Sequence, residues 1–144
     1  MATVELSFSA LPAHVRTARL IVTAVARRSG VPETLLDEVR LAVGEACSRA
    51  VEAHLRCCPD EPVRLEMTDG RRFEVVVNDA VPSEGPDGTL PAESSPGSPA
   101  WDGLGLALGD GPDSLGLAVI AGLADHLVVS PTPKGVQIRM SWPV

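Results

Sequence analysis

The chain has 144 residues, enough for one domain, and 44% of them are hydrophobic, which supports a buried core. Only 3% are aromatic, so that core must be built from aliphatic side chains. No apolar run approaches the roughly 18 residues that a membrane span needs, and the N-terminus lacks a signal-peptide layout. The net charge of −7 argues against nucleic-acid binding, which requires a basic surface. We therefore expect a single-domain cytoplasmic protein over residues 1–144 that contacts neither membranes nor nucleic acid.

The charge is unevenly distributed along the chain. Six of the 19 acidic residues lie between positions 83 and 113, a segment that lacks Lys and Arg and is rich in Gly, Pro and Ser. We predict that residues 83–113 form a long, flexible, lid-like loop. In contrast, four arginines and no acid occur between Leu6 and Pro32, so the beginning of the chain is locally basic.

The cysteine pattern argues against a metal site. Cys47, Cys57 and Cys58 lack the spacing of zinc ligands, and an odd count does not form a complete disulfide framework. We expect free thiols and no bound metal.

The first two predicted elements are a strand and a helix. Residues 2–10 alternate between apolar and polar side chains, the period of two that is typical of a half-buried strand. Pro12 suits the first turn of a helix, and Gly30 can end it. Five apolar positions from Leu11 onward follow helical spacing: Leu11, Val15, Ala18, Val22 and Val25.

A second helix is predicted from Pro32 to the residues before Pro59. Glu33 suits its start because a carboxylate complements the positive end of the helix dipole. The apolar stripe of this helix recurs every three or four residues: Leu36, Val39, Val43, Ala46 and Ala50. Such a stripe predicts one buried face and one exposed face.

Two hairpins complete the predicted elements. Residues 63–67 and 73–77 alternate in polarity, and Asp69-Gly70 between them marks a tight turn. After the lid-like loop, Ser114 is expected to cap a third helix. The second hairpin is predicted from a strand over 126–130, a turn over 131–135 and a strand over 136–142.

This order of elements, β-α-α-β-β-loop-α-β-β, predicts an α+β fold. Two hairpins with segregated helices are typical of a two-layer sandwich, in which a mixed, mainly antiparallel sheet carries helices on one face.

Three segments resemble motifs of the ATP-binding fold that histidine kinases, gyrase-type ATPases and anti-sigma-factor serine kinases share. Residues 36–50 resemble its N-box helix, Val77-Asn78-Asp79 resembles its adenine-site box, and residues 114–125 resemble its glycine-rich phosphate turn. The short length and the absence of a sensor or phosphoacceptor domain favour the anti-sigma branch. The chain is identified as a degenerate member of the anti-sigma-factor serine kinase family, which has the histidine-kinase-type ATPase fold.

The N-box of this family has a glutamate base, followed four residues later by an asparagine that binds Mg²⁺. Glu45 matches the base and is the candidate catalytic residue. Arg49 stands at the metal-ligand position, where a guanidinium offers only donors and a positive charge, so we expect no Mg²⁺. The i, i+4 spacing predicts a Glu45–Arg49 ion pair, and a solvated structural pair remains an open alternative for both residues.

The resemblance assigns four residues to a nucleotide: Arg49, Asp79, Ser114 and Gly116. Asp79 matches the carboxylate that accepts a hydrogen bond from adenine, although a turn residue after a strand is the plainer alternative. Val81 and Ser83 stand where the family has two glycines, and the β-branched valine resists the positive φ that glycine allows. We therefore expect weak ATP or ADP binding.

In the anti-sigma branch, an arginine on the first helix contacts both the sigma factor and its STAS-domain antagonist. Arg19 matches that arginine by its spacing from the N-box, and Arg16 lies one helical turn earlier. Both are candidate partner-binding residues, since arginine suits planar recognition of carboxylates. Ordinary solvated arginines are the alternative. The resemblance further implies a homodimer.

The sequence leaves more than one function open. The first is an anti-sigma-factor-like regulator of transcription, which binds a sigma factor, a STAS-domain anti-anti-sigma factor, or both, with a degenerate nucleotide site. The alternative is an active Mg-ATP-dependent serine kinase that phosphorylates the STAS-domain antagonist. A third hypothesis is that the chain binds a different small anion at Ser114 and Gly116. The altered metal-ligand and glycine positions favour the first function, without enzyme activity.

Overall fold

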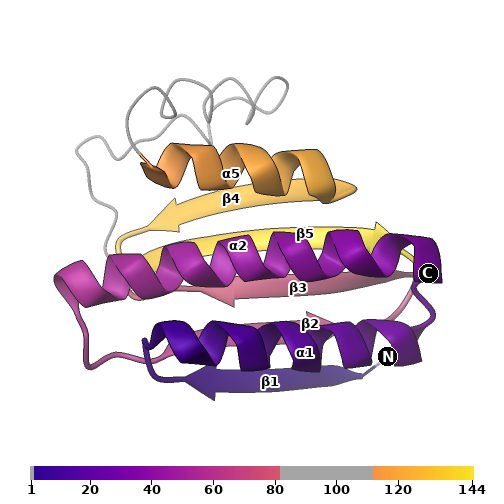
Figure 1. Ribbon diagram of the computed structural model, residues 1–144, viewed down its shortest axis with the longest axis horizontal. Helices are drawn as coiled ribbons and strands as arrows, with labels where there is room; N and C mark the ends of the chain where they lie inside the picture. Colours follow the sequence, from indigo (N-terminus) through magenta and orange to yellow (C-terminus); the bar gives the residue numbers. More distant parts are fainter. Residues whose placement is uncertain (1, 82–111) are drawn as a thin grey trace.

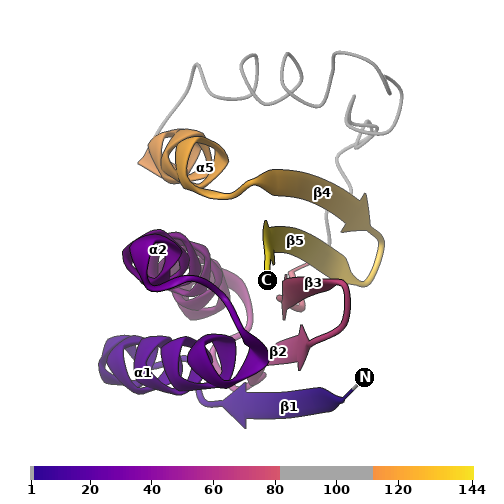
Figure 2. The same ribbon diagram turned by 90° about the vertical axis from the view of Figure 1, so that its right-hand side faces the viewer.

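The computed structural model describes residues 2–81 and 112–144, and for residues 112–117 it describes the backbone alone. In this part of the chain three helices cover one face of a five-stranded sheet (Figures 1 and 2). All four pairings between described strands are antiparallel. The predicted two-layer α+β sandwich is confirmed. No helix among the described residues is both long and apolar enough to cross a bilayer.

The first strand and helix form where the sequence places them. Strand β1 covers Thr3–Phe8 and helix α1 covers Pro12–Ser29, with the proline in the first turn and Gly30 as the C-cap. Four residues of α1 face the core: Val15, Ala18, Val22 and Ala26. Leu11 was predicted to belong to the apolar stripe of this helix. That prediction was wrong, because Leu11 is the N-cap with extended backbone and is 49% exposed.

Helix α2, Glu33–Cys57, is the central helix of the layer and lies between α1 and α5 (Figure 2). All five residues of its predicted apolar stripe are buried, which fixes the face that it turns to the sheet. At 25 residues the helix is roughly 37 Å long, so it spans the sheet from one end to the other.

The first hairpin joins β2, Val63–Thr68, to β3, Arg72–Asn78. Alternate residues of both strands are buried beneath the helices: Val63, Leu65, Met67, Phe73, Val75 and Val77. The residues between them face away from the helices, because successive side chains of a strand point to opposite faces.

The second hairpin joins β4, His126–Thr132, to β5, Gly135–Pro143, and its turn is shorter than predicted. Helix α5, Pro112–Leu123, begins two residues before Ser114, so the expectation that Ser114 caps this helix was wrong. Residues 83–111 of the predicted lid-like loop lie outside the described residues, and residues 112–113 belong to α5 instead of the loop.

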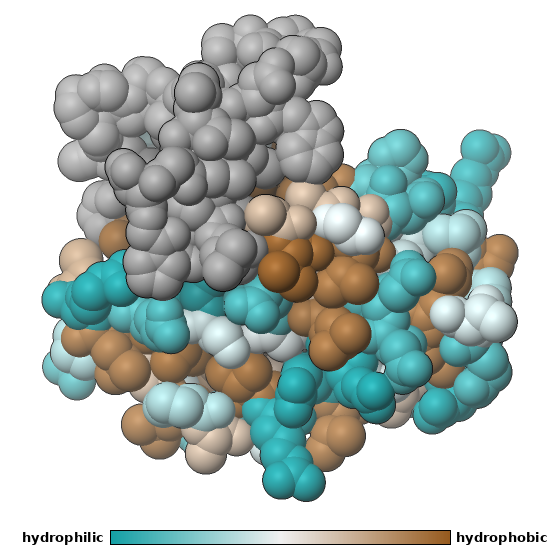
Figure 3. Space-filling model, turned by 45° about the horizontal axis from the view of Figure 1, so that its top comes forward, coloured by the Kyte–Doolittle hydropathy of each residue, from teal (hydrophilic) through white to brown (hydrophobic). Residues whose placement is uncertain are grey.

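The strand order β1-β2-β3-β5-β4 and the antiparallel register put the end of β3 beside the beginning of β5 at the centre of the sheet. The C-terminal half of α2 and the first turn of α5 lie over this end (Figure 1). On the face drawn in Figure 3, apolar and polar side chains are interspersed. Exposed large apolar residues on the helices include Leu20 and Leu41.

Candidate functional site

Asp79 lies directly after β3, where this strand runs beside β5. Its backbone N–H donates to the carbonyl of Val136, which extends the ladder by one residue. Its side-chain Oδ1 accepts hydrogen bonds from the backbone N–H of Val136, at 3.1 Å, and of Val81, at 2.9 Å. The side chain is only 3% exposed, so these contacts satisfy a carboxylate that water hardly reaches.

Arg49 reaches this carboxylate from α2. Its Nη1 lies 3.6 Å from the free oxygen of Asp79, Oδ2, and the arginine side chain is 19% exposed. The predicted Glu45–Arg49 pair was wrong, because Arg49 faces Asp79, which lies on a different element of the fold. Its Nε and Nη1 are buried, and neither has a hydrogen-bond acceptor within the described structure. The pair is therefore electrostatic rather than hydrogen-bonded.

Glu45, the candidate base, lies one turn before Arg49 on α2 and is half-buried. Within residues 2–81 and 118–144, its carboxylate forms neither a hydrogen bond nor an ion pair. The structure thus brings Arg49 and Asp79 together and leaves Glu45 unpaired within that part of the chain.

Ser114 and Gly116 lie in the first turns of α5. Their side chains fall outside the described part, so their predicted contact with a phosphate stays a prediction. Helix α5 packs against α2, which carries both Glu45 and Arg49. All four candidate nucleotide-binding positions therefore belong to elements that meet at this end of the sheet.

Gly135 lets β5 approach Asp79 closely. Its φ is +149°, and a Cβ built on it would lie 1.9 Å from the backbone oxygen of Asp79. A side chain at this position would therefore collide with backbone, which cannot rotate away. The close approach of the two strands is therefore the physical reason for glycine at position 135.

His54 is a residue at this end of the sheet that the sequence reasoning missed. It is fully buried near the end of α2, its Nδ1 lies 2.8 Å from the carbonyl of Glu61, and its Nε2 accepts the N–H of Ala80 at 2.9 Å. These partners require the neutral ring with its proton on Nδ1. The signal was a histidine four residues after Ala50, on the buried stripe of α2. His54 anchors the segment that follows Asp79.

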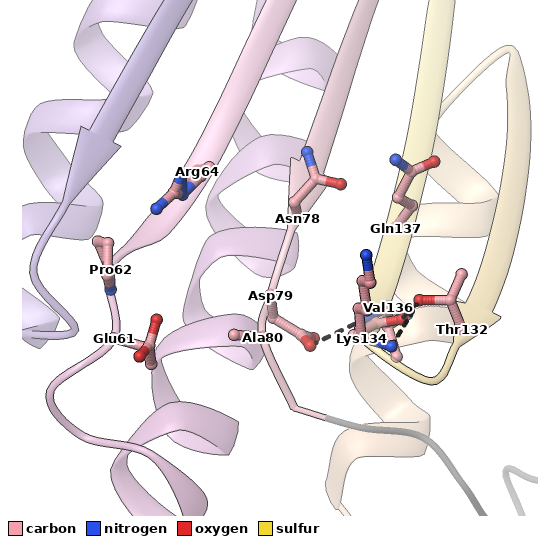
Figure 4. Close-up of a pocket in the computed structure, with 11 residues that line it drawn as sticks. Glu61, Pro62, Arg64, Asn78, Asp79, Ala80, Thr132, Lys134, Val136 and Gln137 are labelled. Atoms are coloured by element: carbon pink, nitrogen blue, oxygen red, sulfur yellow. Dashed lines mark hydrogen bonds between the residues drawn. The ribbon is translucent and has the colours of Figure 1, made fainter.

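A hollow of about 480 Å³ lies at the ends of the strands, on the face away from the helices (Figure 4). Arg64, Asn78 and Gln137 occupy one row across β2, β3 and β5 and line it, together with Lys134 and Glu61. Neither Glu45 nor Arg49 lines this hollow. Asp79 borders the hollow, which therefore lies on the opposite side of this residue from Arg49 and α2.

The candidate partner-binding arginines lie on α1. Arg16 is exposed, while Arg19 is half-buried because its side chain crosses to α2 and contacts Gly44. The two arginines thus differ, although they lie one helical turn apart. All three cysteines are free thiols, and burial raises the pKa of Cys47 to about 12. Among the described residues no cluster of three His, Cys, Asp or Glu side chains could hold a metal ion.

Comparisons with known proteins agree with this architecture. Residues 8–142 match the family described as the histidine kinase-like ATPase domain. The fold is similar to the crystal structure of the RsbU and RsbW domains of Rv1364c from Mycobacterium tuberculosis, with a TM-score of 0.67 and 12% identity. That similarity covers 99% of this chain and 32% of the other. The search of curated proteins gave no match.

Proposed function

Because this chain belongs to the histidine kinase-like ATPase domain family, we propose that it is an anti-sigma-factor-like regulator with a degenerate nucleotide site. It binds a sigma factor, a STAS-domain anti-anti-sigma factor, or both, and it regulates transcription by holding that partner. The observation that carries the proposal is the ion pair between Arg49 and Asp79.

This ion pair involves both of the residues that the resemblance assigns to ligand contacts, one to Mg²⁺ and one to adenine. Arg49 stands where the resemblance requires an oxygen ligand for Mg²⁺, and a guanidinium repels a cation and has no acceptor atom. Asp79 is the expected adenine acceptor, yet its Oδ1 already accepts two backbone hydrogen bonds and its Oδ2 faces Arg49. A nucleotide would therefore have to compete with contacts that the chain makes within itself.

Partner binding is proposed for the face of α1. This helix carries four arginines and no acid, and Arg16, Arg27 and Arg28 are exposed. A cationic helix on a chain of net charge −7 favours encounter with an acidic surface. A homodimer, which the resemblance implies, is part of the proposal and can be tested by sedimentation.

One observation supports the alternative, an active Mg-ATP-dependent serine kinase. Glu45 makes no ion pair with any residue of the described structure, so its carboxylate is not neutralised there as that of Asp79 is. A general base needs such a carboxylate within reach of the hydroxyl whose proton it takes.

Nucleotide assays separate the two functions. We expect neither ATP nor a non-hydrolysable analogue to raise the melting temperature more with Mg²⁺ than without it. We also expect no transfer of labelled phosphate from ATP to a STAS-domain protein, since phosphoryl transfer depends on charge neutralisation around the metal. Arg49→Asn alone should not restore transfer while Val81 and Ser83 remain. Robust Mg²⁺-dependent transfer by the unmodified chain would support the kinase and reject the degenerate site.

Binding assays test where the partner docks. Co-purification with mass spectrometry identifies the protein, and calorimetry with that purified protein compares two variants. Arg19→Ala should cost roughly 2–5 kcal/mol of affinity if the guanidinium makes a desolvated bidentate contact. Glu45→Ala should change the affinity by less than about 0.5 kcal/mol, as a substitution outside the contact does. The reverse order would show that the nucleotide side is the working surface.

A further inference from the structure

Arg19 on α1 contacts Gly44 on α2, and the residue type at each of these positions matters for this contact. The aliphatic stem of Arg19 runs over the α-carbon of Gly44, in the interior of α2. Glycine in a helix interior is unfavourable relative to alanine, because it loses more backbone freedom on folding. A glycine in the middle of a 25-residue helix therefore requires a reason in the packing around it.

The space above Gly44 supplies that reason. A Cβ at this position would lie 2.5 Å from Cδ of Arg19 and 3.3 Å from its Cγ. Both atoms belong to a side chain that can rotate away, so a larger residue would displace Arg19 rather than break the helix. Glycine is thus the residue that allows Arg19 to lie in its present orientation.

The same contact buries the Nε of the guanidinium and leaves its terminal nitrogens free to bind a partner. The Nε of Arg19 is buried and has no acceptor in the described part of the chain. The two terminal nitrogens, Nη1 and Nη2, are not buried without a partner in this way. Thr23 donates its hydroxyl hydrogen bond to the backbone carbonyl of Arg19 and does not engage the guanidinium. The terminal nitrogens are therefore the donors that an incoming carboxylate can meet.

Apolar side chains flank this position on both helices. Leu20, next to Arg19, is 59% exposed, and Leu41, one turn before Gly44 on α2, is 50% exposed. Exposed Arg16 adds a second positive charge one turn along α1. A surface with this composition suits a partner segment that presents a carboxylate beside apolar side chains.

We propose that Gly44 is a positioning residue, which orients Arg19 across the seam between α1 and α2 for a carboxylate of an acidic, partly apolar protein surface. The inference rests on the proposed function, since it deepens the role of Arg19 in partner binding. The physical gain is pre-organisation. An arginine that is already immobilised loses less rotamer freedom when it binds than one that is free in solvent.

The first test needs no partner and follows the Nε–H signal of Arg19 by NMR. We expect slow exchange of this proton with water in the unmodified chain and fast exchange in Gly44→Ala. The matched control is Gly122→Ala, because Gly122 also lies in a helix and no atom within 4 Å would meet a Cβ there. Gly122→Ala should leave the Arg19 signal unchanged. Equal exchange rates in all three proteins would overturn the proposal.

The second test is a double-mutant cycle by calorimetry with the partner identified under the proposed function. Gly44→Ala should weaken binding at least ten-fold without lowering the melting temperature, and Gly122→Ala should leave binding unchanged. In the Arg19→Ala background, Gly44→Ala should have no further effect, since it acts through Arg19. Wild-type affinity in Gly44→Ala, with weak binding in Arg19→Ala, would reject the positioning role and leave the proposed docking face intact. An Arg19→Ala variant that binds normally would instead reject the docking face.

Discussion

Arg19 and Arg49 occupy two regions of the same helix layer and differ in what lies opposite each guanidinium. On the seam between α1 and α2, Arg19 crosses a glycine and keeps its terminal nitrogens at the surface. On the other side of α2, Arg49 faces the buried carboxylate of Asp79. The neighbour thus decides the use of the charge. Gly44 leaves room for Arg19 to lie across the seam, where we propose that it meets an external acid, whereas Asp79 neutralises Arg49 within the fold.

The largest expected effect lies in the Arg49–Asp79 region. Asp79→Ala leaves a mostly buried cation without its counter-charge and leaves the N–H groups of Val81 and Val136 without their acceptor. We expect a loss of about 3–5 kcal/mol in the free energy of unfolding, measured by urea denaturation.

Asp125→Ala is the matched control for Asp79→Ala. Asp125 also pairs with an arginine, Arg72, but the two side chains are 48% and 37% exposed, so this pair is much more accessible to solvent than the Arg49–Asp79 pair. We expect its removal to cost less than about 1 kcal/mol. Equal losses in the two variants would show that burial does not distinguish the two pairs.

Each of the two regions contains a glycine, Gly135 beside Asp79 and Gly44 beside Arg19. Replacement by alanine should change the free energy of unfolding in opposite directions at these two positions. Gly135→Ala forces a Cβ against the backbone of Asp79 at a positive φ, and we expect a loss of roughly 1–3 kcal/mol or more. Gly44→Ala meets only the side chain of Arg19 and should gain up to about 1 kcal/mol from helix propensity. Thermal and urea unfolding of both variants measure the contrast. A destabilised Gly44→Ala would mean that Arg19 cannot move aside.

The smallest expected effect lies at the end of α1. Arg27 forms an ion pair with Glu33, and the two side chains are 60% and 76% exposed. Arg27→Ala should change the free energy of unfolding by less than about 0.5 kcal/mol and partner affinity by less than about 1 kcal/mol. Its main effect should be on the salt dependence of association, measured by stopped flow at several ionic strengths. A large loss of affinity would extend the docking face to the end of α1.

The elements could be predicted because their signals are local. Alternation along 63–67 and 73–77 specified the first hairpin, and the spacing from Leu36 to Ala50 specified the buried face of α2. Leu11 failed because a helix stripe does not reveal where the first turn begins. Extended backbone at the N-cap turns this side chain to solvent.

The contacts of the candidate site could not be predicted in the same way. Sequence spacing offered Glu45 as the neighbour of Arg49, since i, i+4 residues meet on any helix. The actual partner, Asp79, is 30 positions away and comes close only because β3 ends beneath α2. The need for glycine at position 44 could not be predicted either, because it comes from the side chain of Arg19 on another helix.

The pairing of Arg49 with Asp79 also constrains how this sequence can change by single substitutions. Replacing Arg49 by an amide leaves the carboxylate buried without its cation, and replacing Asp79 leaves the cation without its anion. Either first step lowers stability, and natural proteins have little stability to lose. A lineage that gains an amide at position 49 must therefore pass through a less stable protein, or change a second residue first. Each residue of the pair thus acts as an evolutionary restraint on the other.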